Sequence, residues 1–213
     1  LKDNYNDVSE VIPGNGLAQE GIKEIAKKHN ITILTGIVER ANKSLFNSAI
    51  MIGPDGYIGH CRKQYLPNFG PFEEKIYFGE GNETKIFNTI FGNIGVQICY
   101  DLFFPEVSMK LAQQGADVII NLAASPTTSR PLFHRVLPAR AIETTCYYAF
   151  VNNVGTQGNL VFAGESCILD PRGKVMDEIE KFEEGIIICK IPLENVQKYR
   201  DARPVLRDSM NKD

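Results

Sequence analysis

Cys99 lies where the chain changes from one kind of structure to another. Apolar residues occupy every second position from 94 to 98, which is the period of a half-buried strand, and the alternation stops at Cys99. Pro105 can open a helix that runs to Gln114 and is closed by Gly115. The dipole and free N–H groups of a helix N-terminus favour a thiolate, so Cys99 is a candidate nucleophile. The alternative is a buried cysteine that packs as a small hydrophobe.

The composition is that of one globular domain over residues 1–213. The chain is 43% hydrophobic and 23% charged, and its length is enough to bury a sizeable core. A net charge of -3 gives no basic surface for nucleic acid. No apolar run reaches bilayer length, and the first residues lack the apolar core of a signal peptide. We therefore expect no nucleic-acid partner and no membrane partner.

The remaining cysteines and the histidines form no metal or disulfide pattern. The five cysteines, at positions 61, 99, 146, 167 and 189, are odd in number and have no CxxC spacing. This usage predicts free thiols in a reducing cytoplasm. The three histidines are scattered along the chain, so we expect no metal site and no cofactor.

Hydrophobic periodicity predicts alternating helices and strands along the chain. Helices are expected at 17–30, 105–114, 131–145 and 193–199. Strands are expected at 31–38, 45–52, 57–62, 85–90, 93–98, 117–122, 147–152, 160–169, 174–179 and 185–191. The segment 63–81 is a long loop, which in a compact domain is usually functional, and a polar tail begins at residue 200.

The order of these elements places several polar groups at one edge of a sheet. Strand, helix and strand from 93 to 122 imply a right-handed crossover between parallel strands. Ligands bind beyond the carboxyl ends of such strands. Cys99 follows one strand end, and Ala123, Ala124 and Ser125 follow the next. We therefore predict an α/β domain with a pocket lined by Asn121 to Ser125.

Several separate motifs resemble those of the nitrilase, or carbon–nitrogen hydrolase, superfamily. The main ones are CYDLFFPE at 99–106 and RKQYLP at 62–67. Supporting motifs are FEEKIYF at 72–78, ARAIE at 139–143, NVG at 153–155 and GES at 164–166. They occur in the family's order from about residue 20 onward, and a match in several places is specific.

This resemblance implies a four-layer α-β-β-α sandwich and a cysteine hydrolase with a Glu-Lys-Cys triad. Cys99 matches the nucleophile, Lys63 the triad lysine, and Glu74 a second glutamate near the site. The backbone N–H of Tyr100 would join Lys63 in holding the oxyanion. A lysine ammonium beside a thiolate lowers the thiol pKa and can stabilise the developing charge, so the implied roles agree with the residue types.

Other interpretations of these residues stay open at this point. Without the motif, Lys63 would be a solvated surface charge and Glu74 an exposed carboxylate. Arg140 and Glu143 stand three apart on one helix and are expected to form a structural ion pair. The cysteines other than Cys99 are expected to be core residues.

One part of the family pattern has no counterpart in these residues. In the family, the triad glutamate lies in a Pro-Glu motif upstream of the segment that matches 1–16. We therefore expect the chain to lack an N-terminal portion of about fifty residues, with a strand, a helix and a second strand.

The expected activity is hydrolysis of a small carboxamide with release of ammonia, through a thioester on Cys99. The Cys99–Tyr100 pair favours amides, because relatives that cleave nitriles more often carry tryptophan after the cysteine. A nitrile-hydrolysing or glutaminase-type enzyme is an alternative, as is a catalytically silent scaffold if the glutamate is truly absent. The family also implies a homodimer or higher homo-oligomer.

Overall fold

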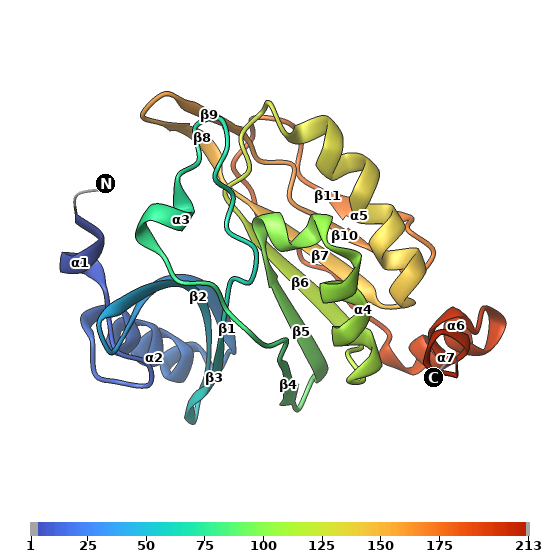
Figure 1. The fold of residues 1–213 in the computed structure, drawn as a ribbon. Helices are drawn as coiled ribbons and strands as arrows, with labels where there is room; N and C mark the ends of the chain where they lie inside the picture. The colour runs from blue at the N-terminus through green and yellow to red at the C-terminus, as the bar shows by residue number, and fades with distance from the viewer. Residues whose placement is uncertain (1–3, 212–213) are drawn as a thin grey trace. The chain divides into compact units, whose positions relative to one another are not determined.

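The computed structural model describes residues 4–211 and divides into two compact units, 1–83 and 84–213 (Figure 1). Each unit contains a β-sheet with helices packed against it, so the predicted mixed α/β class is confirmed. Among the described residues, every helix is too short or too polar to cross a membrane. The single domain expected from the sequence stays a prediction, and each unit is considered by itself below.

The first unit is built on a three-stranded antiparallel sheet in the order β1-β2-β3. Its strands are β1 (Ile33–Ala41), β2 (Ser44–Gly53) and β3 (Gly56–Arg62). Gly56 has a φ of +118°, a left-handed conformation that glycine adopts without strain, and it closes the turn between β2 and β3. The predicted hairpin is therefore confirmed, with both strands slightly longer than expected.

Helix α2 (Leu17–His29) covers this sheet with its apolar face. Ala26 is fully buried and packs with Ile50 and Ile52 of β2, while Lys27 and Lys28 stay exposed. The helix ends at Asn30, which takes a left-handed φ of +53°. This confirms the amphipathic surface helix. A short helix, α1 (Tyr5–Val8), precedes it.

The segment after β3 is mostly loop, as predicted, with one helical turn, α3 (Glu74–Tyr77). Backbone hydrogen bonds tie it to the sheet: the N–H of Gly79 donates to the carbonyl of Leu45 at 2.8 Å, and the N–H of Gly81 donates to that of Lys63 at 2.8 Å. The loop therefore has a defined path across the unit.

A buried carboxylate lies within this sheet. Glu39 of β1 is only 1% exposed, accepts hydrogen bonds from Arg62 Nε at 2.9 Å and Ser48 Oγ at 2.7 Å, and faces His60 Nε2 at 3.6 Å. Burial by itself would raise the pKa of Glu39, but the hydrogen bonds from Arg62, His60 and Ser48 outweigh it and lower the pKa to about 2. Because Arg62 directly precedes Lys63, this cluster fixes the end of β3.

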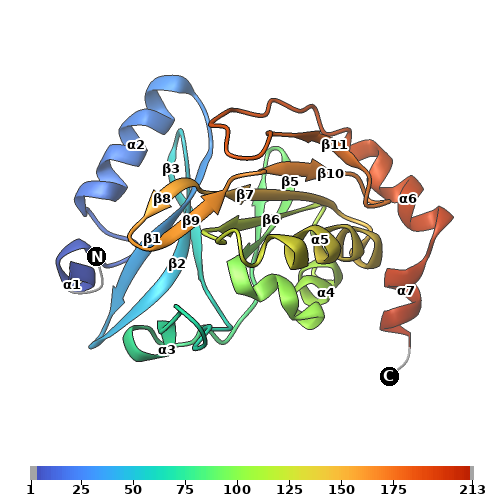
Figure 2. The same cartoon turned by 90° about the horizontal axis from the view of Figure 1, so that it is seen from above.

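The second unit is built on a six-stranded sheet in the order β11-β10-β7-β6-β5-β4 (Figure 2). The three central strands run parallel: β5 (Gly92–Ile98), β6 (Val118–Ala123) and β7 (Tyr147–Asn152). The outer strands pair antiparallel: β4 (Ile86–Thr89), β10 (Cys167–Leu169) and β11 (Val175–Glu178). The predicted parallel pairing of β5 with β6 is confirmed, so both strands present their carboxyl ends at one edge.

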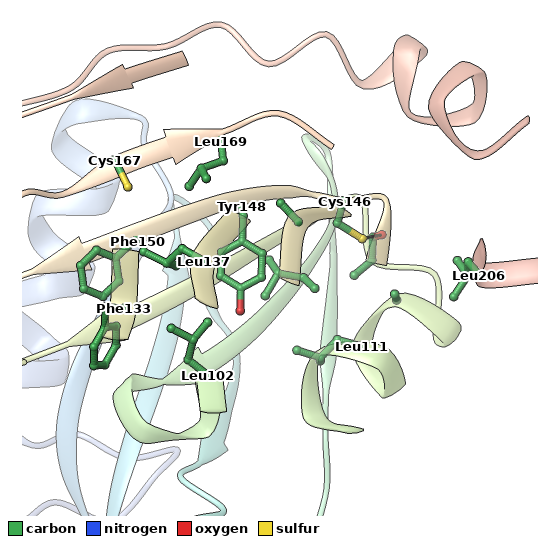
Figure 3. Packing of buried hydrophobic residues seen from close by; sticks show 14 residues of the cluster. Leu102, Leu111, Phe133, Leu137, Cys146, Tyr148, Phe150, Cys167, Leu169 and Leu206 are labelled. Carbon is green, nitrogen blue, oxygen red and sulfur yellow. Dashed lines mark hydrogen bonds between the residues drawn. The ribbon is translucent and has the colours of Figure 1, made fainter. Parts of the chain in front are cut away.

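Helices α4 (Pro105–Gln113) and α5 (Arg130–Thr144) pack against one face of this sheet and against each other. The core between them holds leucine, phenylalanine and tyrosine side chains (Figure 3). Leu102 comes from the turn after β5 and lies among side chains such as Leu137 and Tyr148, while the rings of Phe133 and Phe150 are 5.2 Å apart. The segment that carries Cys99 is therefore anchored in the main core of the unit.

Two strands predicted in the C-terminal half were wrong. The segment 160–169 is not one strand: β9 (Leu160–Ala163) pairs with β8 (Val154–Gln157) in a separate sheet, because left-handed residues at Gly164 and Glu165 turn the chain before β10. The expected strand at 185–191 is absent, because no described strand supplies its hydrogen bonds, and Ile186 and Ile188 are 88% and 91% exposed.

The expected polar tail contains helix instead. The helix expected at 193–199 is confirmed by a 3-10 turn, η3 (Leu193–Asn195), and α6 (Val196–Ala202). Where the polar tail was expected, α6 continues to Ala202 and α7 (Val205–Met210) follows. Leu206 of α7 is 9% exposed and packs into the core beside Leu111 and Cys146. One apolar anchor therefore orders a segment whose composition is mostly polar. Residues 212 and 213 lie outside the described part of the chain.

The buried cluster around Glu39 predicts a pH-dependent contribution to stability. The folded protein holds the pKa of Glu39 at about 2, below the ordinary value of 4.5, so the ionised form is favoured by folding. Glu39→Gln should lower the free energy of unfolding near neutral pH by on the order of 3 kcal/mol. The difference should be fully present above about pH 4.5 and shrink as the pH falls toward about 2.

Urea unfolding of both proteins at a series of pH values measures this difference. Glu20→Gln is the matched control, because the Glu20–Lys23 pair is exposed and should contribute little at any pH. A Glu39→Gln protein that is as stable as the parent at neutral pH would contradict the assignment.

Candidate active site

Cys99 begins a tight turn at the carboxyl end of the parallel strand β5. The strand ends at Ile98, Cys99 takes a left-handed φ of +48°, and a 3-10 turn, η2 (Cys99–Phe103), follows. A left-handed backbone is unfavourable for a residue with a side chain and persists only where the surroundings enforce it. The helix predicted at 105–114 is confirmed as α4 (Pro105–Gln113), and η2 separates its N-terminus from Cys99.

Hydrogen bonds from neighbouring polar side chains hold this turn. Asn121 of β6 donates from Nδ2 to the Cys99 carbonyl oxygen at 3.3 Å. Asp101 folds back, and its Oδ2 accepts the N–H of Ile98 at 3.1 Å. Both side chains are buried, at 0% and 2% exposure, so water cannot replace these bonds. The left-handed backbone of Cys99 is therefore held by two hydrogen bonds. One comes from Asn121 of β6, and the other ties Asp101 back to the end of β5.

A second buried polar side chain, that of Gln97, lies in β5 two residues before Cys99. Gln97 is 1% exposed, and its Oε1 accepts hydrogen bonds from Ser108 Oγ at 3.2 Å and from the Tyr148 hydroxyl. Burial raises the pKa of Tyr148, so this hydroxyl stays protonated and able to donate. These bonds join β5, α4 and β7 at a position two residues before Cys99.

Burial distinguishes Cys99 from most of the other cysteines. Cys61, Cys146 and Cys167 are buried, as predicted. Burial raises the pKa of the Cys146 thiol to about 11 and that of Cys167 to about 12, which suppresses their thiolates. Cys189 is half-buried in an irregular segment, so the prediction of a core role for it was wrong.

Lys63 and Glu74 form a close ion pair in the first unit. Lys63 directly follows β3, is 1% exposed, and donates from Nζ to Glu74 Oε1 at 2.6 Å and Oε2 at 2.8 Å. Its backbone N–H donates to the Asn47 carbonyl at 2.8 Å. A lysine buried to this extent needs a carboxylate partner, so the surface-charge interpretation of Lys63 is excluded.

The residues predicted to line a pocket occupy the carboxyl ends of β6 and the loop after it. Asn121 and Ala123 end the strand, and Ala124 and Ser125 follow. Asn121 contacts Cys99 as described, whereas the Ser125 N–H donates to Asn152 Oδ1 of β7 at 2.8 Å. Within residues 4–211, Asn121 Oδ1 and Ser125 Oγ are buried without a hydrogen-bond partner.

Tyr100, the predicted oxyanion donor, packs its ring against phenylalanines of the same segment. The ring is half-buried, and its centroid lies 5.1 Å from that of Phe104 and 5.7 Å from that of Phe103. These ring contacts hold the Tyr100 side chain against its own segment.

The predicted site residues thus fall into two sets. Lys63 and Glu74 belong to the unit 1–83, and Cys99, Tyr100 and Asn121–Ser125 belong to the unit 84–213. No group of three or more histidine, cysteine, aspartate or glutamate residues within 4–211 is arranged to hold a metal ion.

Sequence reasoning missed several residues that build these two sets. Asp101 and Gln97 support the Cys99 turn, and Glu39 fixes the strand end before Lys63. Glu39 follows the predicted strand 31–38 and is next to Arg40 in the sequence, so no local signal indicates its burial. Asp101 and Gln97 carry no such signal either, because their roles follow from the fold of the turn.

Comparisons with known proteins agree with the fold and the motifs. A nitrilase from Pyrococcus abyssi is 32% identical over 205 residues, which cover 95% of this chain and 75% of that protein. The 2-oxoglutaramate amidase of Bacillus subtilis is 35% identical over 193 residues, covering 90% of this chain and 73% of that protein.

A solved structure has the same fold. XC1258 from Xanthomonas campestris, a CN-hydrolase superfamily protein with an arsenic adduct in its active site, superposes with a TM-score of 0.86. It is 27% identical, and the match covers 97% of this chain and 78% of that one. The predicted nitrilase-type α/β sandwich is therefore confirmed.

The family model for carbon-nitrogen hydrolases matches residues 2–201, nearly the whole chain. Together with two relatives above 30% identity, this match decides the assignment. The chain belongs to the carbon–nitrogen hydrolase family and acts on carbon–nitrogen bonds other than peptide bonds.

Proposed function

We propose that this enzyme releases ammonia from a small carboxamide, with Cys99 as nucleophile and with Lys63 and Glu74 as its partners. The observation that carries the proposal is the backbone of Cys99, whose left-handed turn at a parallel strand end is enforced by Asn121 and Asp101. Such strain is typical of functional positions and has no role in a merely packed cysteine.

The reaction has two stages. The Cys99 thiol gives up its proton and the sulfur attacks the amide carbonyl; the tetrahedral intermediate then collapses, and the C–N bond breaks as the nitrogen takes up that proton and leaves as ammonia. Water then attacks the resulting thioester, releases a carboxylic acid and regenerates the thiol. The Lys63 ammonium and the Tyr100 N–H hold the oxyanion in both stages.

The Lys63–Glu74 pair supports this role for the lysine. Both carboxylate oxygens of Glu74 accept from Nζ, which fixes the position of the Lys63 ammonium although the residue is 1% exposed. A charged, oriented ammonium stabilises an oxyanion without reorganisation during the reaction. The family glutamate that serves as general base is not assigned to any residue of this chain.

The substrate proposed is an amide, because Tyr100 follows the nucleophile and an amidase is among the relatives at 35% identity. A nitrile is the second candidate, because a nitrilase is 32% identical. A glutaminase-type activity would release ammonia from a larger amide by the same steps.

The setting of the enzyme is also part of the proposal. We expect a homo-oligomer in the cytoplasm. The five cysteines, all free in the described chain, support a reducing compartment, and the oligomer is what the family resemblance implies.

Cys99→Ala should abolish ammonia release, because it removes the thiol on which the proposed thioester forms. The measurement is ammonia production from a panel of small amides and nitriles, with the full-length protein. Cys189→Ala is the matched control, because Cys189 is also only half-buried yet has no assigned role, and it should keep parental activity. Normal turnover by Cys99→Ala would exclude the proposed function.

Lys63→Met should lower kcat by about 10²–10³-fold, the loss expected when an oxyanion donor is removed. The control is Lys75→Met, because Lys75 lies in the same loop, is 55% exposed and pairs with Glu80. Steady-state kinetics on both variants, with circular dichroism to verify folding, separates catalysis from stability. A folded Lys63→Met enzyme with parental kcat would show that Lys63 is not part of the catalytic site.

A further inference from the structure

Arg140 of helix α5 reaches back to the turn that carries Cys99. Its side chain is buried, with 8% of the residue exposed. Nε donates to the Leu102 carbonyl oxygen at 2.9 Å, and Nη2 donates to that of Phe103 at 3.4 Å. Both acceptors are the last residues of η2, which begins at Cys99.

Only one nitrogen of the guanidinium forms the ion pair that was expected from the sequence. Arg140 Nη1 donates to Glu143 Oε2 at 2.8 Å, which confirms that pair. Glu143 is 44% exposed, so the pair contributes little by itself. The buried bond to the Leu102 carbonyl is the one that water cannot replace, and together with the part-buried bond to Phe103 it sets the position of the side chain.

The end of a short 3-10 turn leaves carbonyl groups without partners inside the turn. Leu102 is 0% exposed, so its carbonyl needs a protein donor. A guanidinium suits this task, because its planar fork can donate to two adjacent carbonyls at once. Arg140 therefore completes the hydrogen bonding of η2 at the end farthest from the nucleophile.

The opposite end of η2 is held by Asn121 and Asp101. With Arg140 at its last carbonyls, the turn is fixed at both ends by buried polar groups. A strained φ at Cys99 relaxes unless the turn after it is rigid. Loss of the Arg140 bonds would therefore let the thiol and the Tyr100 N–H move from their places.

We propose that Arg140 is a positioning residue for the reaction, acting through η2 on the Cys99 thiol and the Tyr100 N–H. This rests on the proposed function of Cys99. The competing interpretation is that Arg140 only ties α5 to η2 for stability. The two differ in whether Cys99 reactivity changes in a variant that remains folded.

Three variants of the full-length protein distinguish them. Arg140→Met removes the donors but keeps an apolar stem, and should lower kcat about 100-fold with KM little changed, the effect of a small misplacement of the reacting groups. Arg140→Lys keeps the charge but lacks the planar fork, and should lower kcat about 10-fold. Glu143→Gln leaves both carbonyl bonds intact and should keep parental kcat.

The second readout is the rate of Cys99 alkylation by iodoacetamide as a function of pH, followed on the peptide that contains Cys99. Arg140→Met should shift this profile relative to the parent and to Glu143→Gln, whereas a purely stabilising residue would leave it unchanged once folding is verified. If Arg140→Met fails to fold, Arg140→Lys carries the test by the same two measurements.

Parental kcat in a folded Arg140→Met or Arg140→Lys protein overturns the proposal. A lower kcat with an unchanged alkylation profile also overturns it, because Cys99 would then lie in its native setting. Because alkylation of Cys99 requires no turnover, its rate can still be measured and interpreted if Cys99→Ala proves active. In that event the proposed function fails, and the alkylation profile alone decides whether Arg140 positions the thiol.

Discussion

The left-handed backbone of Cys99, with a φ of +48°, is the constraint on which the second unit depends. A residue with a side chain does not hold this conformation alone, because its Cβ then crowds the following carbonyl. Buried bonds from Asn121 and Asp101 enforce it, and Arg140 fixes the turn that follows. These polar groups are 0–8% exposed, so each bond lost would leave an unsatisfied group in the core.

The sheet and its helices make this arrangement possible. Parallel pairing brings the carboxyl ends of β5 and β6 together, so that Asn121 can reach the Cys99 carbonyl. The packing of α5 on the sheet brings Arg140 to η2, and Leu102 buries the middle of the turn in the core. The residues that hold Cys99 in place therefore come from separate elements, each of which is anchored by apolar packing.

The features of this fold that depend only on neighbouring residues, namely strand period, turns and helix faces, were predicted from the sequence. The period of the strand at 93–98, the hairpin turn at Gly56 and the apolar face of α2 were all correct. Contacts between distant segments carry no such signal, so the carbonyl bonds of Arg140 and the burial of Glu39 were not predicted. The apolar composition of 185–191 indicated a strand, but a strand also needs a hydrogen-bonding partner, which the sequence pattern does not report.

In the proposed reaction, Cys99 carries the acyl group during turnover. Rapid acid quench of the full-length enzyme with a slowly hydrolysed amide, followed by peptide mass spectrometry, tests this directly. The expected result is an adduct on the peptide containing Cys99, with the mass of the substrate less ammonia and sensitive to hydroxylamine, as a thioester is. Turnover with the acyl group on another residue, or with no adduct although product forms in a burst, would contradict it.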